Sequence, residues 1–309
     1  MSIRVAAVDC GTNSIRLLVT DLDPQTGAAH ELTRRMEIVR LGQGVDATGR
    51  LAPEALQRTF AACDDYAAEI RNLGAERIRF VATSATRDAA NRDEFVAGVR
   101  SRLGVEPEVI TGSDEAALSF SGATRAVAGE TGHPTPYLVV DIGGGSTEFV
   151  LGDREVEAAR SVDIGCVRLT ERHLTQDPPT LAQITAARGD IDAAIDLAAT
   201  QVPIDQAKTL VGVAGSVTTV SAIALGLPEY DRDRVHLSRI SAQSVRRVAG
   251  DLLASTHAQR AANPVIHPGR VDVIGAGALI LAQIVDRLGL AEVVVSEHDI
   301  LDGIALSLL

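Results

Sequence analysis

The sequence has no tryptophan, and aromatic residues make up only 3% of its 309 residues. Proteins that hold single-stranded nucleic acid stack the bases on aromatic side chains, so this composition disfavours that class. Acidic residues outnumber basic ones by 41 to 29, and the formal net charge is −12. Because duplex binding needs a basic face that neutralises phosphates, we expect no nucleic-acid partner.

Long apolar runs and a leader segment are also missing. Hydrophobic residues reach 46%, yet no uninterrupted run approaches the roughly 20 residues that a membrane helix needs. The N-terminus has no basic stretch followed by an apolar run and a cleavage site. We therefore expect a cytoplasmic protein with no membrane partner, long enough for two domains that each bury a core.

Cysteine is scarce as well, with only Cys10, Cys63 and Cys166. An odd number leaves one thiol unpaired, and the spacing fits no metal-ligand motif, so reduced thiols are expected. No histidine neighbours Cys10 to act as a base, which argues against a nucleophilic thiol there. The histidines are scattered and no H-E-x-x-H occurs, so none is expected to bind a metal.

What the sequence does have is a glycine-rich turn between two apolar runs, Tyr137–Val140 and Phe149–Leu151. The turn reads D-I-G-G-G-S-T-E from Asp141 to Glu148, which predicts strand, tight turn and strand. Asp141 and Glu148 suit a Mg²⁺ that bridges to phosphate, whereas the backbone N–H groups of the turn could form an anion-binding concavity. The candidate phosphate-binding residues are Gly143, Gly144, Gly145 and Ser146. The alternative is a hairpin that holds no ligand.

A second turn of the same kind lies near the N-terminus. The apolar strand Ile3–Val8 runs into D-C-G-T-N-S, and Ile15–Val19 follows as the returning strand. Asn13 and Ser14 place amide and hydroxyl donors where phosphate oxygens would lie. Two such hairpins in one chain suggest two halves that face each other across a cleft.

The order of predicted elements also repeats. Each half opens with three strands and continues with alternating helices and strands, which indicates a duplicated α/β fold. In the first half a helix runs from Pro53 to about Asn72, with apolar positions at steps of three and four. A polar linker at 129–136 separates the halves. We place the two domains at 1–125 and 126–298.

The paired turns resemble the phosphate motifs of the acetate kinase, sugar kinase, Hsp70 and actin superfamily. Within it the chain is most similar to the exopolyphosphatase/guanosine pentaphosphate phosphatase family. The resemblance extends over nearly the whole chain and includes four further stretches: A-T-S-A-T-R-D-A-A-N at 82–91, T-G-S-D-E-A at 111–116, G-C-V-R-L-T-E at 165–171 and G-V-A-G-S-V-T-T at 212–219.

This resemblance implies two ribonuclease H-like (actin-like) domains with the active site in the cleft between them. It also implies that a terminal helix, about 299–309, joins the first domain, and that the protein forms a homodimer. The implied reaction is Mg²⁺-dependent release of the terminal phosphate from inorganic polyphosphate, with a monovalent cation such as K⁺ as a further candidate.

Two features depart from the family pattern. Leu301 stands where many relatives have an arginine, which puts a phosphate contact from that helix in doubt. The chain ends at Leu309, without the extra helical domains of the long members, and this favours short polyphosphate chains.

The resemblance assigns Glu115 to the activation of the attacking water. From the residues alone, an acid in the first turn of a helix is more commonly a dipole partner, and Asp114 is the alternative capping acid. Arg87 is expected to bind phosphate through a charge-assisted fork, and its alternative is a surface arginine that pairs with Asp88 or Asp93.

Three further groups of residues complete the candidates. Gly215 and Ser216 lie where a strand runs into a helix, so their amides could receive a phosphate. Arg16 and Arg168 stay open between a phosphate contact and a structural role. Gly275-Ala276-Gly277 lies inside an apolar helical pattern, so we interpret it as helix packing rather than a dinucleotide fingerprint.

Three rival functions remain at the level of sequence. Guanosine pentaphosphate is the closest rival substrate for the same chemistry. A sugar or acid kinase would use the turn that follows Asp9 equally well. A non-catalytic nucleotide-binding protein of the actin type would bind ATP without turnover and would be insensitive to Glu115→Gln.

Overall fold

The computed structural model describes residues 2–128, 130 and 132–309. The chain divides into two compact units, one formed by Met1–Gly122 with Ile300–Leu309 and the other by Ala123–Asp299. The sequence had suggested boundaries at 125/126 and 298/299. Within the predicted linker at 129–136, residues 129 and 131 lie outside the described residues.

The first unit is built on a five-stranded sheet of order β3-β2-β1-β4-β5. Strands β1 to β3 form an antiparallel meander, whereas β4 and β5 run parallel to β1. The strands are β1 (Ile3–Cys10), β2 (Ser14–Leu22), β3 (Ala29–Ile38), β4 (Arg77–Ala82) and β5 (Glu108–Val109). The helices are α1 (Val45–Thr48), α2 (Pro53–Leu73), α3 (Ser84–Asp88), α4 (Arg92–Leu103), α5 (Gly112–Ala128) and α13 (Ile300–Leu306), of which α5 continues into the second unit.

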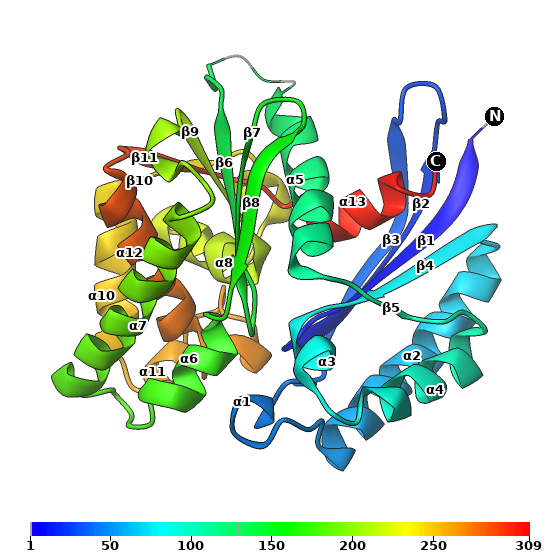
Figure 1. Cartoon of the computed structure of the whole chain (residues 1–309), viewed down its shortest axis with the longest axis horizontal. Coiled ribbons are helices and arrows are strands. Elements are labelled where there is room, and N and C mark those ends of the chain that lie inside the picture. The colour runs from blue at the N-terminus through cyan, green and yellow to red at the C-terminus, as the bar shows by residue number, and fades with distance from the viewer. Residues whose placement is uncertain (1, 129, 131) are drawn as a thin grey trace. The chain divides into compact units, whose positions relative to one another are not determined.

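Both faces of this sheet are covered, and Figure 1 shows α2 and α4 on one face and α13 on the other. Because side chains alternate along a strand, β1 contributes to both cores. Ala6 and Val8 pack with side chains of α2 and α4, whereas Val5 and Ala7 pack with Ile304 and its neighbours on α13. The first turn, which follows β1, is thereby held on a strand that is buried on two sides.

The second unit has a six-stranded sheet of order β10-β11-β9-β6-β7-β8. Its strands are β6 (Tyr137–Ile142), β7 (Thr147–Gly152), β8 (Val156–Val162), β9 (Thr209–Val213), β10 (Arg239–Ser241) and β11 (Glu292–Val295). Its helices are α6 (Cys166–His173), α7 (Leu181–Ala199), α8 (Ala214–Ala224), α9 (Arg232–Val235), α10 (Ala242–Ala254), α11 (His257–Ala261) and α12 (Ile274–Leu288), with 3₁₀ turns at Ile204–Gln206 and Pro268–Arg270.

The two sheets share one topology. Read from the far edge, β8-β7-β6-β9-β11 matches β3-β2-β1-β4-β5, and in both sheets a meander of three strands is followed by two parallel strands. Strand β10 is an antiparallel addition at the edge of the second sheet. The repeat predicted from element order is therefore present as a repeat of strand pairing.

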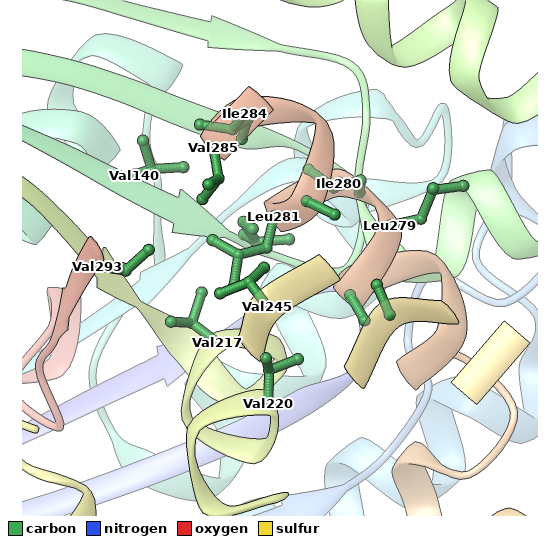
Figure 2. Packing of buried hydrophobic residues seen from close by; sticks show 14 of the residues in the cluster. Val140, Val217, Val220, Val245, Leu279, Ile280, Leu281, Ile284, Val285 and Val293 are labelled. Carbon is green, nitrogen blue, oxygen red and sulfur yellow. The ribbon is translucent and has the colours of Figure 1, made fainter. Parts of the chain in front are cut away.

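Helix α12 forms the centre of the second unit's main core. Figure 2 shows Leu281 and Val285 of this helix close to Val140 of β6, Val217 of α8 and Val245 of α10. A helix that packs against several elements at once must be apolar around most of its surface. This explains why the Gly275-Ala276-Gly277 stretch lies in a helix, as predicted, rather than in a nucleotide-binding turn.

The predicted elements match the observed ones to within a few residues at most ends. The helix expected from Pro53 to about Asn72 runs over Pro53–Leu73, and Glu115 lies in the first turn of a helix that begins at Gly112. The short helices α1, α3, α9 and α11 were not predicted, because four or five residues carry no recognisable periodicity. Strand β10 and the longer helix α10 were not predicted either. Among the helices of the described residues, none combines the length and apolarity that a bilayer span requires.

Candidate phosphate-binding and catalytic site

The two glycine turns have the same hydrogen-bonded geometry. Gly11 N–H donates to the Ser14 carbonyl at 2.9 Å, and Gly143 N–H donates to the Ser146 carbonyl at 3.0 Å. Each turn follows a strand that carries an aspartate one residue before its end. The amide of Gly143 is thus used inside its own turn, so the predicted phosphate contact from this residue would not be made by that N–H.

The two turns differ at the residue that faces the aspartate across the strand pair. Asp9 faces Arg16, which donates to Asp9 Oδ2 from Nε at 2.9 Å and from Nη2 at 2.6 Å. Asp141 faces Glu148 instead. The first hairpin therefore contains an internal ion pair, which gives Arg16 a structural partner, and the second hairpin brings together two acids.

Asp141 and Glu148 form the candidate metal site. The residues are 7% and 1% exposed, and directly opposed residues share a face of the sheet with Cβ atoms about 4.5–5.5 Å apart. Two carboxylates so placed repel each other unless a cation or proton is shared. Glu148 also accepts a hydrogen bond from Ser161 Oγ at 2.7 Å.

This acid pair fits Mg²⁺. Mg²⁺ is commonly held by one or two carboxylates together with water and substrate phosphates. Within the described part of the chain, no three or more His, Cys, Asp and Glu side chains gather into a potential metal site. Such a site would therefore need oxygen ligands from water and phosphate to complete it.

The glycine turn of the second unit is held by the start of α6. Three of its carbonyls accept hydrogen bonds from that helix. The Gly143 carbonyl accepts from Cys166 N–H at 3.0 Å, and the Gly144 carbonyl accepts from the N–H groups of Val167 at 2.8 Å and Arg168 at 3.1 Å. The Gly145 carbonyl accepts from the side chain of Arg168, through Nε, at 2.7 Å. In a planar trans peptide the N–H points opposite to the C=O. The N–H groups of Gly144, Gly145 and Ser146 therefore point away from α6.

Successive N–H groups that point to one side form an anion-binding concavity. Helix α6 thus orients the predicted phosphate-binding amides by binding the carbonyls on their other side. Gly165 makes this approach possible, since a Cβ there would lie 2.4 Å from the Gly144 carbonyl oxygen. The Nε of Arg168 donates a hydrogen bond to the turn itself, which favours a structural role for this residue over a phosphate contact.

The turn of the first unit is held in a comparable way by the segment after β3. Gly42 N–H donates to the Thr12 carbonyl at 2.8 Å, and Val39 and Arg40 N–H donate to the Asn13 carbonyl at 3.1 and 2.9 Å. Because its preceding carbonyl is bound on that side, the Asn13 N–H points to the opposite side.

Two buried side-chain atoms of this first turn lack a hydrogen-bond partner within the described residues, namely Thr12 Oγ1 and Asn13 Nδ2. A buried polar atom without a partner costs about 1–3 kcal/mol, and a ligand oxygen or a water would remove that cost. Asn13 was predicted to bind phosphate. Thr12 was not singled out, because a threonine in a turn has no distinguishing pattern.

The predicted catalytic pair is in contact. Arg87, in α3, donates from Nη1 to Glu115 Oε2 at 3.0 Å and to the Ile110 carbonyl at 3.1 Å. The side chain of Glu115 is 11% exposed and that of Arg87 is 25% exposed. Neither Asp88 nor Asp93 is needed to explain the position of Arg87.

The neighbouring acid, Asp114, has a different role. Its carboxylate accepts from Thr111 Oγ1 at 2.7 Å, and its N–H donates back to Thr111 Oγ1 at 3.2 Å. This reciprocal pair is a capping arrangement at the start of α5. Asp114 is therefore the capping acid, and Glu115 projects from a helix turn that is already fixed.

A second strand-to-helix junction holds Gly215 and Ser216, at the start of α8. Ala214 adopts a left-handed φ of 69° there, which is strained for any residue with a Cβ. The guanidinium of Arg270 covers Gly215 so closely that an added Cβ would lie 1.9 Å from Nη1. Sequence reasoning missed Arg270, which follows a P-G turn with no motif of its own.

Cys166 connects the two phosphate-binding candidates of the second unit. Its N–H donates to the Gly143 carbonyl, and its side chain lies beside Ser216 of α8, because a Cβ added at Gly277 would meet both Ser216 Oγ and Cys166 Cβ. Burial raises the pKa of the Cys166 and Cys10 thiols and raises the pKa of Cys63 to about 12. A raised pKa keeps a thiol protonated, which agrees with the expectation that Cys10 is not a nucleophile.

The repeated sheet topology, with an aspartate near the end of the first strand and a glycine turn after it in each unit, is that of the ribonuclease H-like, actin-related class. Glycine turns of this kind can bind phosphate through their backbone amides. The chain belongs to the Ppx/GppA phosphatase family, whose model matches residues 19–309. The family and the fold predicted from the sequence are confirmed.

Individual relatives agree with this assignment. The chain is 51% identical to Exopolyphosphatase 2 of Mycobacterium tuberculosis, over 99% of this chain and 98% of that protein. It is 27% identical to a guanosine-5'-triphosphate,3'-diphosphate pyrophosphatase of Aeromonas salmonicida, over 98% of this chain and 59% of that protein. The crystal structure of an exopolyphosphatase-like protein superposes with a TM-score of 0.96 at 46% identity, covering 99% of this chain and 98% of the other.

Proposed function

We propose that the protein is an exopolyphosphatase that hydrolyses the terminal phosphoanhydride of inorganic polyphosphate. The observation that carries this proposal is the glycine turn of the second unit, whose carbonyls are bound by α6 so that three amides point to the opposite side. The similarity to Exopolyphosphatase 2 over nearly its whole length supports polyphosphate as the substrate.

In this proposal the amides of Gly144, Gly145 and Ser146 bind oxygens of the terminal phosphate, and Asn13 donates to a further oxygen. Asp141 and Glu148 would hold Mg²⁺, which when bound neutralises charge on the phosphate oxygens.

Glu115 orients the attacking water and accepts its proton. The water oxygen forms a bond to the terminal phosphorus while the bond from that phosphorus to the bridging oxygen breaks. The products are inorganic phosphate and a chain one phosphate shorter, and the proton passes from Glu115 to solvent. No acceptor substrate is needed, which separates this reaction from that of a kinase.

Guanosine pentaphosphate is the second candidate substrate, because its 5'-terminal phosphoanhydride would undergo the same chemistry. The relative from Aeromonas salmonicida supports it, since that protein is named for such a nucleotide. At the start of α8, the amides of Gly215 and Ser216 together with Arg270 offer a further anion-binding position for the rest of a substrate.

A homodimer and a dependence on K⁺ are further parts of the proposal that rest on the family resemblance alone, and a cytoplasmic location stays an expectation from the sequence. Light scattering during size-exclusion chromatography tests the dimer, and replacement of K⁺ by Na⁺ in the assay tests the monovalent ion. A monomer at micromolar concentration, or equal rates in both salts, would remove the corresponding part.

The central experiment measures phosphate release with Mg²⁺ from tripolyphosphate, long polyphosphate and guanosine pentaphosphate in parallel. We expect release from polyphosphate by the wild type and a loss of at least about 100-fold in kcat for Glu115→Gln, as for removal of a general base. Asp114→Asn is the matched control, because it changes a neighbouring carboxylate that caps the helix.

Each outcome separates the alternatives. Release confined to the nucleotide would select the second candidate substrate. ADP formation from ATP that depends on an added sugar or acid would indicate a kinase. Tight ATP binding without turnover, unchanged in Glu115→Gln, would indicate a non-catalytic nucleotide-binding protein and would overturn the proposed function.

A further inference from the structure

We propose that Arg87 is a positioning residue that acts on the reaction through Glu115, and that it is not a phosphate ligand. This inference rests on the proposed role of Glu115 as the residue that activates water. It changes the function expected for Arg87 from the sequence, where a fork to phosphate was predicted.

The inference rests on the two hydrogen bonds that Arg87 donates from Nη1. Arg87 Nη1 donates both to Glu115 Oε2, at 3.0 Å, and to the Ile110 carbonyl, at 3.1 Å. Ile110 lies between β5 and α5, and so belongs to the main chain that leads into the helix of Glu115. A single side chain therefore fixes both the entry into α5 and the carboxylate in its first turn.

The elements on either side leave this contact little freedom. Strands β4 and β5 pair in parallel, with Val81 opposite Glu108, so α3 and α5 each follow neighbouring strands of one sheet. At the start of α5 the Thr111–Asp114 cap holds the first turn. Arg87 and Glu115 thus lie on helices that follow paired strands of one sheet, and the first turn of α5 is held by its own cap as well as by Arg87.

Burial makes the partner necessary. The Glu115 side chain is only 11% exposed, and a carboxylate taken that far out of water must be paired or hydrogen-bonded to stay charged. A general base acts only in its charged form and only in the correct orientation. The Arg87 bond supplies both conditions, because it stabilises the anion and restricts rotation of the carboxylate.

A phosphate-binding arginine presents its parallel N–H groups to the ligand. In this structure the terminal nitrogen Nη1 is already engaged by two protein oxygens, one of them the main-chain carbonyl of Ile110. The geometry is that of a support for another side chain, and it predicts coupling between Arg87 and Glu115 instead of independent contributions.

A double-mutant cycle tests this coupling. The proteins are the wild type, Arg87→Ala, Glu115→Gln and the double variant, assayed for phosphate release from tripolyphosphate with Mg²⁺. We expect Arg87→Ala to lower kcat at least about tenfold with KM within twofold, and the double variant to be no slower than Glu115→Gln within about threefold. A double variant that loses the product of the two single losses would overturn the inference.

Binding provides a readout that does not need activity. Tripolyphosphate affinity is measured by calorimetry for Glu115→Gln and for the double variant, both with Mg²⁺. Equal affinity supports the positioning role, since no phosphate contact is lost. A drop of tenfold or more in the double variant would show that Arg87 binds phosphate directly, and would overturn the inference.

Two further variants guard against a purely structural explanation. Arg87→Lys keeps the charge and one donor near Glu115, so it should recover part of the kcat that is lost in Arg87→Ala. If the two variants have the same melting temperature and Arg87→Lys recovers no kcat, the result would count against the proposal. Arg100→Ala removes an exposed arginine of the same unit that pairs with Glu106 at 3.6 Å, and controls for loss of positive charge.

The outcomes also separate this inference from the proposed function. If the wild type releases no phosphate from any of the substrates, the proposed function fails. If it releases phosphate but the losses of Arg87→Ala and Glu115→Gln multiply, only the role of Arg87 fails.

Discussion

At the scale of single residues, the two hairpins differ at one position that decides what each can bind. Arg16 faces Asp9 in the first hairpin and Glu148 faces Asp141 in the second. Arg16 pairs with Asp9 inside the first hairpin, whereas the second hairpin places two carboxylates opposite each other, and carboxylate oxygens are the ligands that Mg²⁺ takes. We therefore expect Mg²⁺ to bind at the second hairpin.

This difference predicts opposite effects of Glu148→Gln with and without Mg²⁺. Without metal the variant should be more stable than the wild type by up to about 1 kcal/mol, because opposed like charges are removed. With millimolar Mg²⁺ the wild type should gain stability and the variant should not. Thermal unfolding in both buffers checks this, with the exposed surface acid Asp251 changed to Asn as the control.

An equal Mg²⁺-induced rise in melting temperature for wild type and Glu148→Gln would contradict the assignment of the metal site. A metal-free variant that is less stable than the wild type would show instead that the hydrogen bond from Ser161 to Glu148 outweighs the repulsion.

Ala214 has a backbone conformation that lowers the stability of the protein. Its φ of 69° lies in the left-handed region, where a Cβ costs roughly 1–2 kcal/mol. Ala214→Gly should raise the free energy of unfolding by up to about 1 kcal/mol, since the entropy of glycine offsets part of the gain. Ala186→Gly, in the exposed middle of α7, should lower it by about 1 kcal/mol and serves as the matched control. Denaturant unfolding measures both, and a loss at position 214 would be contrary to expectation.

At the scale of elements, helix α6 is the part of the fold that turns a hairpin into a phosphate-binding site. Gly165→Ala should push α6 away from the glycine turn, because the new Cβ would meet the Gly144 carbonyl at 2.4 Å. The carbonyls would then lose their helix partners and the amides their orientation. We expect KM for tripolyphosphate to rise at least about tenfold, with secondary structure preserved.

The control for that variant is Gly189→Ala. Gly189 lies in α7, where an added Cβ meets nothing within 4 Å, so the change should stabilise the helix by about 0.5–1 kcal/mol and leave KM unchanged. Steady-state kinetics on both proteins checks the prediction. Unchanged KM in Gly165→Ala would mean that the turn keeps its peptide orientation without α6.

The element scale also shows what the sequence could reveal. Both hairpins were predictable, because D-x-G turns between apolar strands have a local signature, and helix α2 followed from its periodicity. The bond from Arg168 to the Gly145 carbonyl and the cover of Gly215 by Arg270 could not be predicted. These contacts join residues distant in sequence, and they depend on how closely two elements approach rather than on any local pattern.

At the scale of the whole molecule, the first unit is completed by the last ten residues of the chain, Ile300–Leu309, while the second unit is a continuous stretch. Helix α13 covers the face of the first sheet opposite α2 and α4 (Figure 1). Leu301 is 1% exposed in that core, so the position where the family resemblance implies an arginine is an apolar packing position in this chain.

This arrangement predicts that truncation after Asp299 destabilises the first unit selectively. The deletion removes four buried side chains of α13, namely Ile300, Leu301, Ile304 and Ala305. At about 1.5–3 kcal/mol for each large apolar side chain, the loss should amount to several kcal/mol. It also removes the ion pair between Arg34 and Asp302. Hydrogen exchange should accelerate in β1, β2 and β4 and stay unchanged in β6, β7 and β9.

Removal of Leu309 alone is the control, because this residue is 44% exposed and its loss should change exchange in neither unit. Leu301→Ala gives a milder test in the full chain, with an expected cost of about 2–5 kcal/mol confined to the first unit. Equal acceleration in both sheets after truncation would show that the units unfold together. In that case α13 would stabilise the whole molecule and not the first unit alone.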